Sequence, residues 1–126
     1  MQSYLFRKLL ATRPPHQGRI YVEIALPGYN DANVEWDDSA CLVSVCEVLN
    51  FIRTYNQAAV NDVPTYSDNP VHITLGTHII TLQGDWTLGV IYLDSLSSPD
   101  DRLLTTLIDY MVSDGFLVPD RDLTSH

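Results

Sequence analysis

The sequence predicts an α+β fold in which an antiparallel sheet of about four strands carries two long helices on one face, in the order β-α-β-β-β-α. Three observations lead to this prediction. Apolar residues alternate along residues 20–26, they recur at helical spacing in residues 38–57 and 98–115, and residues 71–94 form a β-rich stretch divided by glycines. Alternation is typical of a half-buried strand, and helical spacing is typical of an amphipathic helix.

The first strand is predicted over residues 20–26, where every second residue is apolar, and it ends at Pro27-Gly28. A helix is then expected from about Asp38 to Gln57, because this stretch contains neither Gly nor Pro. Asp37 or Asp38 would be its N-cap. The expected core arc of this helix consists of Cys41, Leu42, Val45, Cys46, Val48, Leu49 and Ile52.

The same helix is apolar on more than one stripe. Val43 and Phe51 fall outside the core arc, beside Glu47. Leaving both exposed would forgo burial worth roughly 1.5 to 3 kcal/mol for each side chain. We therefore expect a cover, which could be the basic N-terminal segment, another part of the fold or a second copy of the chain. A homodimer with Val43, Glu47 and Phe51 as self-association residues is the favoured alternative.

Three strands are predicted between Val71 and Asp94, separated by Gly76-Thr77 and Gly84-Asp85. Two-residue connections with Gly first are typical of type II′ hairpins. In the first hairpin Ile73 would face Ile80 and Val71 would face Leu82, which pairs apolar residues on one side of the sheet. One long strand with a bulge at Gly76 is the alternative.

The last helix has start and stop signals at both ends. Ser98 is the expected N-cap, Pro99 the first helical residue, and Asp101 the acid three residues after the cap. Gly115 and Phe116 would end the helix in a Schellman turn. The apolar stripe between the two ends consists of Leu103, Leu104, Leu107, Ile108, Met111 and Val112.

We expect the chain to form a single domain over residues 1–126. Its charge is divided between two parts. Residues 1–19 form a basic leader with four basic residues and no acid, whereas residues 20–126 form an acidic body with three basic and sixteen acidic residues, giving a formal charge of 3 − 16 = −13. The leader would be a strand or a short amphipathic helix stopped by Pro14-Pro15, with an organelle transit peptide as the alternative. An acidic body favours docking onto basic protein surfaces and disfavours a nucleic-acid ligand.

The two cysteines are predicted to be free and buried. In a helix, Cys41 and Cys46 lie about 140° apart around the axis and about 7.5 Å apart along it, which does not fit disulfide geometry. Two free thiols fit a reducing compartment, so a cytoplasmic location is expected. The sequence has no apolar run long enough to span a bilayer, so no membrane partner is expected.

The sequence contains no common catalytic motif, so we expect neither enzyme activity nor a cofactor. In the hairpin, His72 and His78 would point to opposite faces and could not share a metal ion. Residues 31–35 begin like a calcium loop, but Trp36 and Leu42 occupy the positions that require Gly and Glu. A nucleophilic role for Cys41 is disfavoured because the neighbouring acids raise a thiol pKa.

The predicted partner-binding site is the loop before the first helix, where aromatic residues stand among acids. Such anchors suit a basic protein surface. The alternative is local: Trp36 could pack on Cys41, and the acids could stabilise the helix N-terminus. The predicted site residues are Tyr29, Asp31, Glu35, Trp36, Asp37 and Asp38.

From size and charge we expect a small, acidic, non-enzymatic antagonist that covers a basic surface on a partner protein or protein–nucleic-acid complex. Immunity proteins and phage anti-defence inhibitors, including anti-CRISPR proteins, are analogues in size and charge. Two alternatives stay open. One is a structural or assembly subunit, for example of a phage particle, and the other is a small enzyme or ligand-binding module whose site is assembled from distant residues.

Overall fold

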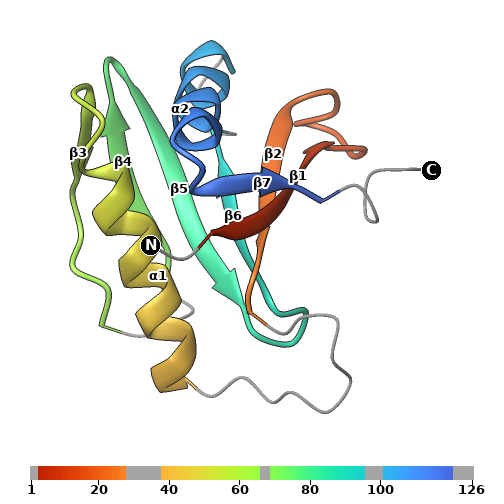
Figure 1. Cartoon of the computed structure of the whole chain (residues 1–126). Coiled ribbons are helices and arrows are strands. Elements are labelled where there is room, and N and C mark those ends of the chain that lie inside the picture. The colour runs from red at the N-terminus through yellow and green to blue at the C-terminus, as the bar shows by residue number, and fades with distance from the viewer. Residues whose placement is uncertain (1–2, 28–37, 66–68, 96–100, 121–126) are drawn as a thin grey trace.

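The computed structural model describes residues 3–27, 38–65, 69–95 and 101–120 and shows an α+β fold (Figure 1). Within these residues, seven strands form one mixed sheet and two helices pack on it. The elements in chain order are β1 (Tyr4–Leu10), β2 (Ile20–Ala25), α1 (Asp38–Ile52), β3 (Ala58–Val60), β4 (Val71–Leu75), β5 (His78–Asp85), β6 (Val90–Asp94), α2 (Arg102–Ser113) and β7 (Leu117–Pro119).

The sheet has the order β3-β4-β5-β6-β2-β1-β7, and it is antiparallel except for the parallel pair of β1 and β7. The predicted α+β class is thus confirmed, but the described sheet has seven strands rather than about four, and one strand pair is parallel. The prediction missed β3 and β7 because each has only three residues, which is too short to show an alternating pattern. It did not choose between a strand and a helix for the segment that forms β1, because Arg7 and Lys8 interrupt the apolar residues there.

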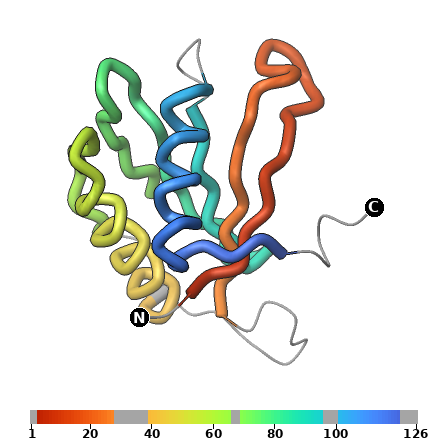
Figure 2. The backbone as a smooth tube through the Cα atoms, turned by 45° about the horizontal axis from the view of Figure 1, so that its top comes forward, coloured from red at the N-terminus to blue at the C-terminus, as the bar shows by residue number. Residues whose placement is uncertain are grey.

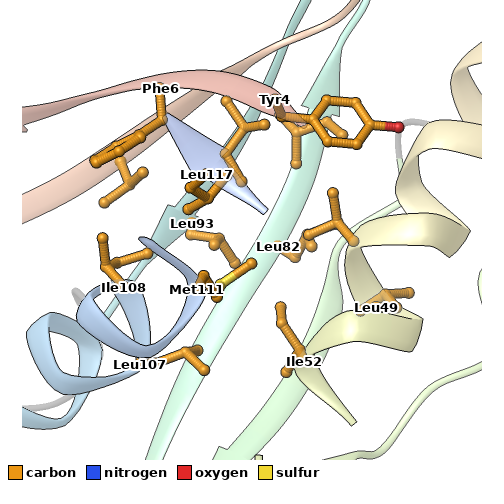
Figure 3. Packing of buried hydrophobic residues seen from close by; sticks show 14 of the residues in the cluster. Tyr4, Phe6, Leu49, Ile52, Leu82, Leu93, Leu107, Ile108, Met111 and Leu117 are labelled. Atoms are coloured by element: carbon orange, nitrogen blue, oxygen red, sulfur yellow. The ribbon is translucent and has the colours of Figure 1, made fainter. Parts of the chain in front are cut away.

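Both helices lie over one face of the sheet (Figure 2). Alternate residues of the strands point into a single core between the sheet and the helices, and Figure 3 shows Leu82 and Leu93 of the sheet opposite Ile52 of α1 and Met111 of α2. The opposite face of the sheet carries half-buried and exposed side chains. We call it the open face.

The hairpin between β4 and β5 confirms the predicted register. Val71 pairs with Leu82 and Ile73 with Ile80, around the two-residue turn Gly76-Thr77. Gly76 has φ +61°, and Thr77 is not among the described residues with a positive φ, which is the pattern of a type II′ turn. The alternative of one long bulged strand is excluded by this pairing.

The second predicted turn, at Gly84-Asp85, is wrong. β5 continues through both residues, Gly84 pairs with Ile91, and the chain turns over residues 86–89 instead. The absence of a side chain at Gly84 leaves room for the ring of Trp86, because an ideal Cβ at Gly84 would lie 1.9 Å from Cη2 of that ring. The glycine that adopts a positive φ at this turn is Gly89, at +69°.

Helix α1 begins at Asp38 as predicted but ends at Ile52, five residues before Gln57. The chain leaves the helix through short turns in which the N–H groups of Thr54 and Tyr55 bond to the carbonyls three residues earlier. The buried arc is also rotated from the predicted one. It includes Ser44, whereas Leu42 and Cys46 are only half-buried.

Helix α2 confirms the predicted stripe and C-terminal turn. Leu104, Leu107, Ile108 and Met111 are buried. The N–H of Phe116 bonds to the carbonyl of Met111, that of Gly115 bonds to Val112, and Gly115 has φ +78°, which together make a Schellman turn. The helix starts at Arg102, and the predicted cap at Ser98-Pro99 lies outside the described residues.

The basic leader is part of the sheet rather than a separate segment. Arg7 of β1 donates to Glu23 of β2 at 2.6 Å. Arg19 binds Asp101 at 2.6 Å, and the other carboxylate oxygen of Asp101 accepts the N–H of Ile20 at 3.0 Å, so the start of β2 is held at the start of α2. Among the described residues, no helix is long and apolar enough to cross a membrane.

Candidate protein-binding surfaces

The predicted partner-binding loop falls almost entirely on residues 28–37, which the structure does not describe. Tyr29, Asp31, Glu35, Trp36 and Asp37 lie outside the described residues, and Asp38 is the first residue of α1. The loop therefore stays a prediction.

The predicted self-association residues fall into two different environments. Phe51 stacks on Phe116, with ring centroids 4.3 Å apart, and it also contacts Tyr110 at 5.7 Å. Of the three covers considered for Phe51, the structure thus shows another part of the fold. Val43 is 58% exposed, and Glu47 is half-buried beside it on α1. Whether Val43 and Glu47 contact a second copy stays a prediction.

An aromatic cluster explains why Phe51 is turned inward. Rings from β1, α1, α2 and the turn before β7 contact one another in series, so residues from both ends of the described chain cover this side of α1. The members are Tyr4, Phe116, Phe51, Tyr110 and Tyr55. Sequence periodicity could not reveal this cover, because Phe116 lies after the last helix.

A shallow groove of about 480 Å³ runs along the outer face of α1. Leu42 and Cys46 are half-buried in it, and Val43 is the exposed apolar residue at its side. We call this surface the α1 groove. Its lining residues are Ser39, Leu42, Val43, Cys46, Glu47 and Asn50.

Glu47 is fixed at the groove by a hydrogen bond from the hydroxyl of Tyr4. Figure 3 shows the Tyr4 hydroxyl pointing toward α1. Burial, reinforced by this bond to Glu47, raises the pKa of Tyr4 to about 12. The hydroxyl therefore continues to donate to Glu47 even above the ordinary tyrosine pKa of about 10, and this bond holds the Glu47 side chain beside the apolar part of the groove.

The cysteines are both free, but only Cys41 is buried. Cys46 is half-buried and lines the α1 groove. The prediction that both are buried is therefore wrong for Cys46. The rotation of α1 that brings Ser44 and Phe51 inward is the reason, because it turns Cys46 toward the outside.

A second hollow, of about 370 Å³, lies at the end of β5 and β6. We call it the β5–β6 pocket. Gln83 and Tyr92 are register partners whose neighbours Leu82 and Leu93 face the core, so both point to the open face, and Asp85 follows two residues after Gln83. The lining residues are Gln83, Gly84, Asp85, Trp86, Thr87 and Tyr92.

The sequence interpretation missed this pocket because it placed a turn at Gly84-Asp85. The overlooked signal is a glycine two residues before a tryptophan, since residues two apart in a strand share a face and the smaller residue leaves space for the larger. The indole N–H of Trp86 is buried and has no acceptor among the described residues. The position of the ring is therefore set by packing on Gly84 rather than by a hydrogen bond.

The histidines lie as the hairpin register predicts. His72 pairs with Thr81 and His78 with Leu75, which places their side chains on opposite faces. His72 bonds to Asp62 through both its backbone N–H and its ring Nδ1, at 2.7 and 3.0 Å, and these bonds lower the pKa of Asp62. In the described part of the chain, no three His, Cys, Asp or Glu side chains gather as metal ligands would.

The described surface thus offers two recognition features: an apolar groove with a fixed carboxylate on α1, and a pocket with an aromatic ring and a carboxylate on the open face. Comparison with protein-family models, curated proteins and solved structures finds no match to this chain.

Proposed function

We propose that this protein is a non-enzymatic binding protein that covers a basic surface of another protein through the α1 groove and the acidic segment before it. The observation that carries the proposal is Val43, a large apolar side chain that is 58% exposed in the middle of a helix whose other side is fully packed. Contact with a partner would bury this surface and gain roughly 25 cal/mol for each Å² of apolar area.

The charge of α1 favours a basic partner. Residues 38–52 contain Asp38 and Glu47 and neither Lys nor Arg, and the segment before the helix adds Asp31, Glu35 and Asp37. A partner with cations beside an apolar contact would pair with these carboxylates, and the opposite charges would speed its association at low salt. Occupation of a working surface on such a partner would inhibit it, which is the activity of an antagonist of the immunity or anti-defence type.

The same charges disfavour a homodimer through the α1 groove. A two-fold contact brings the same patch of each copy together, so both copies of Glu47 would lie in one interface, and each chain carries a formal charge of −9. Like charges that meet at an interface cost binding free energy. We therefore propose a basic protein as the partner, and the experiment below also tests for a homodimer.

The experiment compares Val43→Glu with a matched control, Val63→Glu, because Val63 is 82% exposed and lies outside the groove. Tagged wild type and both variants are used to capture partners from the native host, with identification by mass spectrometry and affinity measured on the purified partner. The wild type and Val63→Glu should retain one basic protein with an on-rate that falls as salt rises past about 0.1 M. Val43→Glu should lose it.

Retention of the same partner by Val43→Glu with unchanged affinity would contradict the α1 groove as the binding surface. A partner that binds equally well at high salt would contradict the electrostatic part. Light scattering gives the third readout: a wild-type dimer that becomes a monomer in Val43→Glu alone would replace the basic partner by a second copy of the chain.

A further inference from the structure

The β5–β6 pocket lies on the open face, whereas α1 packs on the other side of the sheet, so it is a separate candidate site. Its volume of about 370 Å³ falls within the range of small-ligand sites, roughly 300–1,000 Å³. Its wall is formed by two adjacent strands of the sheet and the turn that joins them. Such a wall is more rigid than a loop.

The pocket contains a carboxylate that no described basic side chain neutralises. Within the described residues, the one hydrogen bond of Asp85 is from the backbone N–H of Leu88 to Oδ1, at 3.3 Å, which leaves Oδ2 without a described donor. The next acid on this face is Glu23, the register partner of Tyr92, and Arg7 already binds Glu23 at 2.6 Å. The unmatched negative charge at this end of the open face therefore comes from Asp85.

An aromatic ring stands next to this carboxylate. Tyr92 is half-buried, and burial followed by the charges of Glu23 and Asp85 raises its pKa, while the charge of Arg7 opposes this rise. Tyr21 contacts it with ring centroids 6.1 Å apart, which supports the ring from the neighbouring strand. A cation over such a ring gains from the ring quadrupole and from the nearby carboxylate together.

We infer that the β5–β6 pocket binds the guanidinium group of an arginine side chain presented by a peptide or protein, with Asp85 accepting its N–H groups and Tyr92 stacking on its plane. Guanidinium is favoured over ammonium because it is planar, stacks on aromatic faces and is less strongly hydrated. The site does not depend on the α1 groove, and it can belong to the same partner or to another one.

The test uses N-acetyl-arginine amide as the probe and two-dimensional amide NMR of the whole chain as the readout. We expect saturable shifts in the millimolar range for the amides of residues 83–87 and 92 and for the Trp86 indole. The citrulline analogue has nearly the same shape without the charge and should give no saturable shift. The lysine analogue should bind more weakly than the arginine probe.

Two variants locate the site. Asp85→Asn should weaken the probe about fivefold, the scale expected for loss of an exposed ion pair. Asp109→Asn removes an exposed acid on α2 and should leave the affinity unchanged. Three outcomes would each overturn the assignment: equal shifts from the citrulline analogue, an equal effect of both variants, or lysine binding as tight as arginine. The citrulline comparison uses the wild type, so it does not depend on the folding of a variant.

Discussion

Substitution of Gly84 by alanine tests the contact that shapes the end of β5. An ideal Cβ at Gly84 would lie 1.9, 2.2 and 2.6 Å from three atoms of the Trp86 ring, all shorter than real Cβ contacts. The ring must therefore move, and overpacking of this kind costs about 1–3 kcal/mol. Alanine is otherwise favoured over glycine in a strand by roughly 0.5–1 kcal/mol, since Gly84 is not among the positive-φ glycines. The two effects together predict a net destabilisation of about 0–2.5 kcal/mol, centred near 1 kcal/mol.

The assay is urea unfolding followed by indole fluorescence in a Trp36→Phe background, so that the signal comes from Trp86 alone. Adding Trp86→Leu to Gly84→Ala should remove the overpacking penalty and leave alanine neutral or stabilising, which gives a coupling free energy of about 1–3 kcal/mol between the two positions. A Gly84→Ala protein that is as stable as its parent, with an unchanged emission maximum, would refute the reasoning.

Three further predictions use the same structure. The bond from Arg19, together with smaller contributions, holds the pKa of Asp101 below its usual value. The ionised Asp101 therefore stabilises the fold fully above the unfolded-state pKa of about 3.9, and this stabilisation is lost as pH falls through the lower folded-state value. Asp101→Asn should therefore lower stability at pH 7 by about 1–3 kcal/mol and weaken the acid dependence of thermal unfolding; an unchanged profile would count against the pair. A thiol reagent should label Cys46 in the native protein and Cys41 only after denaturation, and labelling in the reverse order would contradict the packing of α1. Phe51→Glu should reduce helical content in far-UV circular dichroism, because its ring stacks in the aromatic cluster, and a fully folded variant would show that this contact is dispensable.

The features that could be predicted from the sequence are those with local causes. The β4–β5 register follows from a two-residue turn and from apolar pairs a few positions away, and the Schellman turn follows from one glycine and the residue after it. The stripe of α2 follows from helical spacing over twelve residues. Each depends on residues close in sequence.

The features that could not be predicted depend on distant residues. The inward rotation of α1 depends on Phe116 covering Phe51, and the carboxylate of Asp101 binds Arg19, which is 82 residues away in sequence. Glycine before aspartate is also a common turn signal, and only the ring of Trp86 shows why Gly84 belongs to a strand. The β5–β6 pocket was missed for this reason. The α1 groove was anticipated only through Val43 and Glu47.

The parallel contact between β1 and β7 sets the order in which the chain can fold during its synthesis. Tyr4 pairs with Leu117, so β1 leaves the ribosome more than a hundred residues before the strand that covers its outer side. The β1–β2 hairpin can form early, but the apolar side chains of Phe6 and Ile24 stay open to solvent until β6, α2 and β7 follow. Pairings of this sequence separation slow folding and prolong the exposure of strand edges. Chaperone binding to the nascent chain should therefore persist until β7 has been released, and the docking of β7 beside β1 should be a late step of folding.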